Sequence, residues 1–342
     1  MRRRIAPVLS ALIALAVPAL PAVAADHVKI GTSHISGYPG VPVALAQGYF
    51  AQQGIGAEIV FFESAQPISV GVASGDIDFG VSGMSAGFYS LASQGQLKLI
   101  ASSSRDMPGF FSLVAVASDK AWQGGLTSPK DLAGRTVGVT QIGTALHYSI
   151  GMMSTKYGFP MSSVTVKPLQ SNPNVLSALL GGTIDAAVLP VSPVQPAIGR
   201  GELHVLAWMG DVARSSSGAA LFTSTRTANE RGDLIRRFLV AYRHGLKDFH
   251  DAFADENDHR RDGPLAATIL PVMAEFTRVS VEQFDRATPF SDPQGRLDPI
   301  DIDQQIAWYK SQGLLKPEVK AADIVDPRYA IIMPHNETTA AK

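Results

Sequence analysis

Short apolar segments alternate with longer amphipathic ones along the first part of the chain. Strand patterns cover residues 28–31, 57–62, 77–81 and 97–101, and helix patterns cover residues 41–53, 67–74 and 86–94. Gly54 suits the end of the first helix, because glycine adopts the left-handed conformation of a helix C-terminus at little cost. Such alternation is typical of a largely parallel sheet covered by helices, so the pattern predicts an α/β fold.

Part of this pattern occurs twice. Residues 75–81 (GDIDFGV) have a counterpart at 182–188 (GTIDAAV), where glycine, isoleucine, aspartate and valine coincide. At the same shift, residues 30–33 fall on residues 137–140. The repetition predicts two lobes of similar plan. A chance match is the alternative, because strands draw on a small set of residue types.

The second copy is predicted to form a lobe inserted in the first. We expect lobe 1 to comprise residues 25–116 and 210–342, and lobe 2 to comprise residues 117–209. The apolar runs 110–116 and 204–209 bracket lobe 2, so we interpret them as the two segments that cross between lobes and act as hinges. A molecule with two hinges can close on a ligand. A long helix at 230–254, with a buried face that includes Phe238 and Tyr242, is predicted to return to lobe 1.

The N-terminus has the pattern of a secretory signal peptide. Arg2, Arg3 and Arg4 precede an apolar stretch and the small-residue triplet 22–24. We predict a signal peptide over residues 1–24, cleavage near Ala24 and a periplasmic location. The apolar stretch is shorter than the about 20 residues that span a bilayer, so a permanent membrane anchor is the weaker alternative.

Composition narrows the class of protein. The 342 residues suggest about two domains, and 46% hydrophobic residues suffice for a substantial core. The formal net charge of −1 offers no general attraction to nucleic acid. The chain has no cysteine, which excludes disulfides, thiolate metal sites and a lipid anchor on a cysteine at the cleavage site.

The sequence contains no clear catalytic or cofactor motif. Asp76 and Asp78 are interpreted as turn residues because Asp185 occupies the equivalent turn of the repeat. His34 and His147 have no second metal ligand at helical spacing. The glycines of residues 138–143 are not followed by the lysine of a phosphate loop. We therefore expect no enzyme activity, no cofactor and no metal.

Small polar residues instead follow the predicted strands, where a parallel sheet places its ligands. They are Ser33, Ser36 and Tyr38 after the first strand, Ser64 and Gln66 after the second, Ser82 and Ser85 after the third, and Thr140, Gln141 and Thr144 after the first strand of lobe 2. Each group precedes a helix, so hydroxyls and free backbone N–H groups are predicted to converge on one cleft. Helix capping is the alternative role for any one of these hydroxyls.

Five stretches together resemble the substrate-binding proteins of nitrate, sulfonate and taurine ABC importers, a family that also includes binders of thiamine-pyrimidine precursors. They are VALAQGYFAQQGI, VASGDIDFGVSGMSA, DLAGRTVGVTQIGTALHY, LLGGTIDAAVLPVSP and the closing DIDQQIAWYKSQGLL…DPRY. The resemblance implies a two-lobed periplasmic binding protein of type II, with a ligand between the lobes and delivery to a transmembrane permease. It also implies ligand contacts by position at Ser33, Tyr38, Gln66, Ser82, Met84, Ser85, Thr140, Gly143, Thr144 and Pro190.

Three functions stay open at this point. The first is uptake of a small organic anion, a sulfonate or carboxylate, by a monomeric binding protein. The second is binding of a neutral or cationic nitrogen heterocycle stacked on Tyr38 or Phe110, which a carboxylate facing the cleft would favour. The third is a pyrimidine-synthesising enzyme of the same fold, which predicts His34 or His147 at the cleft.

Overall fold

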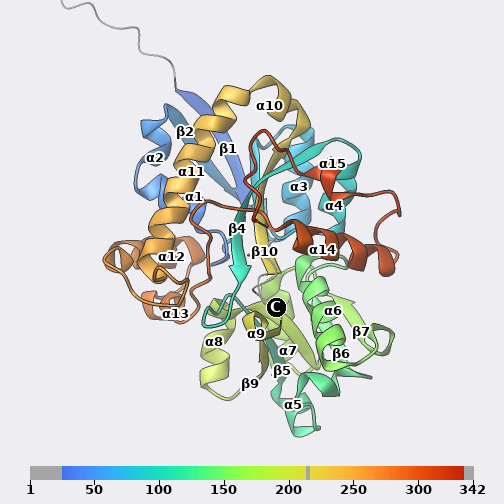
Figure 1. Ribbon diagram of the computed structural model, residues 1–342. Helices are drawn as coiled ribbons and strands as arrows, with labels where there is room; N and C mark the ends of the chain where they lie inside the picture. The colour runs from blue at the N-terminus through green and yellow to red at the C-terminus, as the bar shows by residue number, and fades with distance from the viewer. Residues whose placement is uncertain (1–24, 213–215, 335–342) are drawn as a thin grey trace, which may run out of the picture.

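Two five-stranded sheets form the framework of the computed structural model, which describes residues 25–212 and 216–334 (Figure 1). The predicted signal peptide, residues 1–24, lies outside the described residues. The first sheet has the order β2-β1-β3-β10-β4. Its strands are β1 (Asp26–Thr32), β2 (Ile55–Phe61), β3 (Phe79–Ser82), β4 (Leu97–Asp106) and β10 (Ser216–Ser224). In this sheet β10 is antiparallel to both of its neighbours, whereas β1 is parallel to β2 and β3.

The second sheet repeats this plan with the order β7-β6-β8-β5-β9. Its strands are β5 (Leu113–Ser118), β6 (Thr136–Val139), β7 (Thr165–Pro168), β8 (Ala186–Pro190) and β9 (Leu203–Trp208). Here β5 takes the place of β10 and is antiparallel to both neighbours. The predicted α/β class and the internal repeat are therefore confirmed, because each strand has a counterpart at the same place in the other sheet.

The repeated aspartates explain why this part of the sequence occurs twice. The backbone N–H of Lys29 donates to Asp78 Oδ2 at 2.8 Å, and that of Thr136 donates to Asp185 Oδ2 at 2.7 Å. In both sheets the aspartate N–H donates back to the carbonyl of the same partner. Each carboxylate thus fixes the start of one central strand against the next, which is the structural role that the sequence favoured over catalysis.

The crossing segments lie elsewhere than expected. The runs 110–116 and 204–209 were interpreted as the hinges, but most of their residues belong to β5 and β9, which pair with each other in the second sheet. The chain crosses instead between β4 and β5, and again after β9. A long apolar run is typical of a sheet strand as well as of a buried hinge, so apolarity does not distinguish the two. Lobe 2 accordingly includes Leu113–Val116, which we had expected in lobe 1.

Helices cover both sheets. The helices with the first sheet are α1 (Gly40–Ala46), α2 (Tyr49–Gln52), α3 (Ala65–Ser74), α4 (Ala86–Ser93), α10 (Thr225–Glu230), α11 (Gly232–Phe253), α12 (Ala266–Thr277), α13 (Val281–Asp285), α14 (Pro299–Ser311) and α15 (Ala321–Ile324). The helices with the second are α5 (Asp119–Gln123), α6 (Ala145–Tyr157), α7 (Asn172–Leu180), α8 (Val191–Gly199) and α9 (Met209–Val212), with 3-10 turns at Pro129–Leu132 and Met161–Ser163. Among the described helices, none combines the length and apolarity needed to cross a membrane.

The predicted long helix is confirmed as α11, and it closes the main core of the first lobe. Phe238 stacks on Phe79 of β3 with ring centroids 3.8 Å apart, and Tyr242 donates from its hydroxyl to the Ser102 carbonyl. The side chains of Phe238 and Tyr242 are both fully buried. Burial of an aromatic ring stabilises by about 1.5–3 kcal/mol, so this face of α11 anchors the returning chain to the sheet.

Candidate functional site

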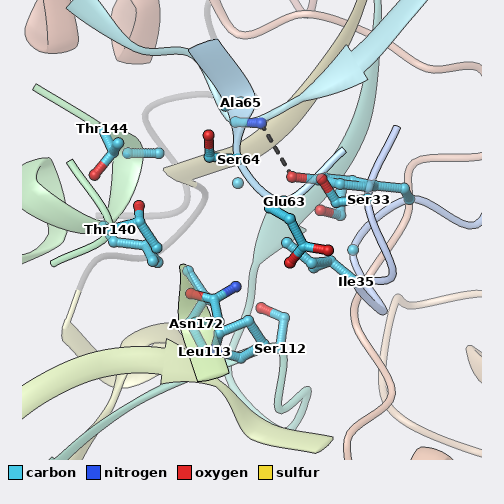
Figure 2. Close-up of a pocket in the computed structure, with 18 residues that line it drawn as sticks. Ser33, Ile35, Glu63, Ser64, Ala65, Ser112, Leu113, Thr140, Thr144 and Asn172 are labelled. Carbon is cyan, nitrogen blue, oxygen red and sulfur yellow. Dashed lines mark hydrogen bonds between the residues drawn. The ribbon is translucent and has the colours of Figure 1, made fainter. Parts of the chain in front are cut away.

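A cavity lies between the two sheets, and its wall takes residues from both lobes (Figure 2). The lining residues are Ser33, Ile35, Gly37, Tyr38, Glu63, Ser64, Ala65, Gly83, Ser104, Ser112, Leu113, Thr140, Thr144, Ala145, Leu146, Asn172, Pro190 and Gly218. Its volume is about 70 Å³.

The strand order brings these residues together. Ser33 directly follows β1, Gly83 directly follows β3, and Thr140 directly follows β6, while Pro190 is the last residue of β8. The carboxyl ends of the parallel strands in both sheets therefore face the same cavity, as expected for a parallel α/β sheet.

Three helix N-termini also point at the cavity. Ala65, Ala145 and Asn172 line it, and they are the first residues of α3, α6 and α7. The first N–H groups of a helix have no partner within the helix, and the helix dipole favours negative charge there. The Ser64 side chain makes no capping bond to α3, whereas the Thr144 hydroxyl accepts from the His147 N–H. The cavity can thus offer several N–H and O–H donors to an anionic group.

The charge in the described lining, in contrast, is negative and disfavours an anionic ligand. Glu63 is its one charged side chain, and no lysine, arginine or histidine is among the described residues that line the cavity. Glu63 is exposed, and Figure 2 shows it reaching into the space that Ser33, Ser112 and Asn172 surround. A carboxylate with no cation beside it in a cavity attracts positive charge and repels negative charge.

A second carboxyl group, that of Asp106, lies outside the cavity lining and is bonded to the lining residue Ser112. The Ser112 hydroxyl donates to Asp106 Oδ1 at 2.8 Å. Asp106 is the last residue of β4, and its burial raises the pKa of the carboxyl to about 7, although the bond from Ser112 lowers it in part. Because the Ser112 hydroxyl donates its proton to Asp106, its oxygen is an acceptor toward a ligand in the cavity.

Five of the ten predicted contacts line the cavity: Ser33, Tyr38, Thr140, Thr144 and Pro190. Tyr38 is buried, which raises the pKa of its hydroxyl to about 12, and its oxygen accepts the Gly83 N–H at 3.2 Å. The tyrosine therefore stays neutral and keeps its own proton available for donation. These residues come from both lobes, as the sequence predicts.

Gln66 and Ser82 do not line the cavity. Gln66 lies in the first turn of α3, exposed, with its side chain beside Gly87 of α4. Ser82 is the last residue of β3, and its hydroxyl donates to the Gly83 carbonyl at 3.2 Å. Strand alternation sends successive side chains to opposite faces, so proximity to the strand end did not suffice to place them.

Met84, Ser85 and Gly143 are also absent from the lining and have structural roles. Met84 is buried in a core cluster of the first lobe. Ser85 caps α4 by accepting the Phe88 N–H, the alternative role weighed for such hydroxyls. Gly143 has a φ of +80° and its carbonyl accepts the Ala86 N–H at 2.8 Å, a contact between the lobes.

Sequence reasoning missed several lining residues, above all Glu63 and Asn172. Glu63 follows the end of β2 by two positions and so obeys the strand-end rule, but only hydroxyl and amide residues were selected there. Asn172 begins α7 and resembles an ordinary helix-start residue. Its buried Oδ1 has no hydrogen-bond partner within the described part of the chain, and only the structure reveals this.

Neither histidine considered for catalysis lies in the lining. His34 stacks on Phe61 with ring centroids 3.7 Å apart. His147 is buried in α6, which lowers the pKa of its imidazole to about 4, and its Nδ1 accepts the Gly143 N–H at 3.1 Å. Phe110 is likewise buried elsewhere, edge-on to Phe290. Across residues 25–212 and 216–334, no group of three histidine or acidic side chains is placed to hold a metal ion.

A family model described as NMT1/THI5 like matches residues 36–252, more than half of the chain. The chain belongs to the NMT1/THI5-like family. No curated protein matches it in sequence.

Solved structures share the fold of this NMT1/THI5-like protein at low sequence identity. The alkanesulfonate-binding protein SsuA from Xanthomonas axonopodis pv. citri, bound to MOPS, is 19% identical with a TM-score of 0.70, over 89% of this chain and 99% of that one. The aliphatic sulphonate-binding protein SsuA from Escherichia coli is 14% identical with a TM-score of 0.69, over 91% and 95%. The nitrate-binding protein NrtA from Synechocystis PCC 6803 is 11% identical with a TM-score of 0.70, over 88% and 86%. The fold is that of periplasmic binding proteins.

Proposed function

We propose that this protein is the substrate-binding component of an ABC importer, which captures a small molecule between its lobes and delivers it to a transmembrane permease. The observation that carries the proposal is the cavity between two duplicated sheets, at the carboxyl ends of the strands of both. The similar structures of sulfonate- and nitrate-binding proteins add support. Binding proteins of this type work by closing around a ligand, which requires a site shared by two lobes.

The ligand in this proposal carries an anionic group, a sulfonate or carboxylate. The N-termini of α3, α6 and α7 and the hydroxyls of Ser33 and Thr140 are its donors. A helix N-terminus contributes roughly 0.3–2 kcal/mol and a charge-assisted hydrogen bond roughly 1.5–3 kcal/mol. Four or five such donors reach the about 8 kcal/mol of micromolar binding without an arginine.

A second candidate is binding of a neutral or cationic nitrogen heterocycle. Glu63 favours it, since a carboxylate in the lining suits an N–H donor. Phe110, one of the two rings expected to stack on such a ligand, lies outside the lining. The enzymatic alternative has less support, because its expected histidines, His34 and His147, lie outside the cavity wall as well.

The same proposed role implies where the protein acts and in which oligomeric state. A signal peptide over residues 1–24 would export the chain to the periplasm, and the mature protein would act there as a monomer, without cofactor or metal. Mass spectrometry of the mature protein and its sedimentation coefficient measure cleavage and oligomeric state directly.

A thermal-shift screen tests the ligand class. A ligand at a hundred times its dissociation constant stabilises the folded protein by about 2.7 kcal/mol, which is measurable as a rise in Tm. The panel contains alkyl and aromatic sulfonates, nitrate, aromatic carboxylates and aminopyrimidines. A rise in Tm with one anionic class of compound supports the proposal. A rise with the neutral heterocycles alone would replace it by the second candidate.

A further inference from the structure

We propose that the cleft binds its anionic ligand together with a proton on Asp106, which acts through the hydroxyl of Ser112. When Asp106 is ionised, Ser112 donates to it and presents only lone pairs to the cavity. When Asp106 is protonated, the carboxyl donates to Ser112, and the Ser112 hydroxyl is free to donate to the anion. The inference rests on the proposed binding of an anion, and it adds a positioning residue, Asp106, that lies outside the cavity lining.

The bond between Ser112 and Asp106 is the first observation. Ser112 Oγ lies 2.8 Å from Asp106 Oδ1, and both residues are buried. The carboxyl forms no other hydrogen bond with any residue that the structure describes. A serine hydroxyl has one proton to donate and an ionised carboxylate has none, whereas a neutral carboxyl has one. The protonation state of Asp106 therefore decides which of the two groups donates.

Ser112 is held where its hydroxyl reaches both the carboxyl and the cavity. It directly precedes β5, and its carbonyl accepts the Val191 N–H at 3.0 Å. The N–H of the preceding residue, Phe111, donates to the Thr288 carbonyl at 3.0 Å. Figure 2 shows Ser112 among the side chains that border the cavity. Because these bonds fix the backbone, a proton on Asp106 changes the hydrogen bonding of the Ser112 hydroxyl and leaves the residue in place.

Asp106 can gain and lose a proton near neutral pH. Burial raises the pKa of its carboxyl to about 7, the bond from Ser112 lowers it in part, and the like charge of Asp301 on α14 raises it further. A solvent-exposed aspartate would stay ionised at this pH. The buried pair can therefore exist in both hydrogen-bonding arrangements under conditions in which the protein is folded.

The other charged groups nearby are directed to other partners or lie farther along the strand. Arg105, the neighbour of Asp106 in β4, pairs with Asp292 at 2.8 Å. β10, which pairs with this end of β4, contains no charged residue, and neither does the crossing segment 107–111. The charged residues of α10 and α15 lie near the opposite end of β4. The proton on Asp106 is thus controlled by its burial, by Asp301 and by Ser112.

This arrangement couples the affinity for an anion to pH. An anion has only acceptors, so it gains a hydrogen bond from Ser112 only while Asp106 is protonated. Ligand binding and proton binding then favour each other, because each stabilises the state that the other needs. Affinity is therefore highest below about pH 7 and falls as pH rises through the pKa of Asp106.

Isothermal titration of the mature protein at pH 6 and pH 8.5 tests the coupling. The probes are ethanesulfonate, nitrate and benzoate, which stay fully ionised in this range, and the buffers are Bis-Tris and Tris, which contain no sulfonate. The pKa of Tyr38 is about 12 and that of His147 about 4, so neither titrates between these values. Each probe that binds should bind at least about fivefold more weakly at pH 8.5, because only the protonated fraction of Asp106 offers the donor.

Two variants separate this coupling from a general effect of pH on the fold. Asp106→Asn does not titrate, and Ser112→Ala keeps the titrating carboxyl but lacks the hydroxyl. In both, the affinity should differ by less than about twofold between the two pH values. Asp303→Asn, at an exposed position of α14, should keep the pH dependence of the wild type. The Tm of each variant at both pH values shows that it is folded.

The outcomes distinguish this inference from the proposed function. Binding with equal affinity at pH 6 and pH 8.5 overturns the proton coupling and leaves an anion-binding protein. A pH dependence that persists in Ser112→Ala overturns the route through the hydroxyl, and one that persists in Asp106→Asn overturns the assignment of the proton to Asp106. Absence of binding with all three probes at both pH values overturns the anionic ligand class, and this inference with it.

Discussion

Trp308 of α14 packs so closely on Gly151 of α6 that a Cβ atom at residue 151 would lie 2.1 Å from the indole Nε1. The two helices belong to different lobes, and Figure 1 shows them stacked where the lobes meet. Tyr148, on the same helix as Gly151, is buried in the core cluster of the first lobe. The lobes are therefore joined by a packed contact as well as by the two crossing segments.

The substitution Gly151→Val should disrupt the packing of Trp308 on α6. The added side chain would overlap the indole, and overpacking of this kind costs about 1–3 kcal/mol. We expect a lower Tm, together with at least tenfold weaker ligand binding because the arrangement of the lobes that forms the cavity is disfavoured. Gly199→Ala is the control, since nothing lies within 4 Å of a Cβ atom there. Recovery of Tm in the double variant with Trp308→Leu would show that the overlap is the cause, and an unchanged Tm in Gly151→Val would contradict the packing argument.

Asp106 predicts how stability depends on pH. Burial raises the pKa of this carboxyl from 3.8 to about 7 in the folded state, so the folded protein holds a proton that the unfolded chain has lost between these values. Its contribution to the free energy of unfolding is therefore full below about pH 4 and is lost as pH rises toward 7, with a maximum on the order of 4 kcal/mol.

Asp106→Asn tests this by removing the titration at nearly constant shape. The free energy of unfolding, measured by urea denaturation at pH 5 and pH 8, should fall less with pH in the variant than in the wild type. Asp303→Asn, at an exposed position of α14, should follow the wild type. Parallel pH profiles for wild type and Asp106→Asn would refute a raised pKa at this site.

The duplication was predictable because it is local. The aspartates at 78 and 185 and the glycines near them recur since each strand start needs the same turn and the same carboxylate bond. Five of the ten strand-end polar residues named from the sequence line the cavity, because parallel sheets place their carboxyl ends there. Such features follow from neighbours in sequence, and a single chain is enough to reveal them.

The site residues that were predicted wrongly or missed depend on contacts with residues distant in the sequence. Ser85 and Thr144 look alike in sequence, each a hydroxyl before a helix, and both cap that helix, yet only Thr144 also lines the cavity. The difference lies in how each lobe is turned toward the other. Glu63 was missed for a related reason, because an exposed acidic residue is ordinary unless the described lining around it contains no lysine, arginine or histidine.

His147 predicts a second, opposite pH effect. Burial lowers the pKa of its imidazole from 6.5 to about 4, so the folded protein binds fewer protons than the unfolded chain in this range. The stabilisation from this group is present above pH 6.5 and is lost as pH falls toward 4. In His147→Asn, which retains an acceptor for the Gly143 N–H, the loss of Tm between pH 6.5 and pH 4.5 should be smaller than in the wild type. A larger loss would contradict a buried neutral imidazole.

Thr140→Val tests whether the strand-end hydroxyls bind the ligand. The side chain is buried in the cavity wall and forms no hydrogen bond with a described residue, so the folded protein should tolerate an isosteric change there. Loss of one hydrogen bond to the ligand, about 0.5–1.5 kcal/mol, corresponds to a roughly two- to twelvefold weaker affinity in isothermal titration with the ligand that the thermal-shift screen identifies. Thr165→Val, exposed on β7 of the same lobe, should bind as the wild type does. If Thr140→Val keeps both its Tm and its affinity, the ligand makes no bond to this hydroxyl, and its anionic group must be held by the helix N-termini and the Ser33 hydroxyl.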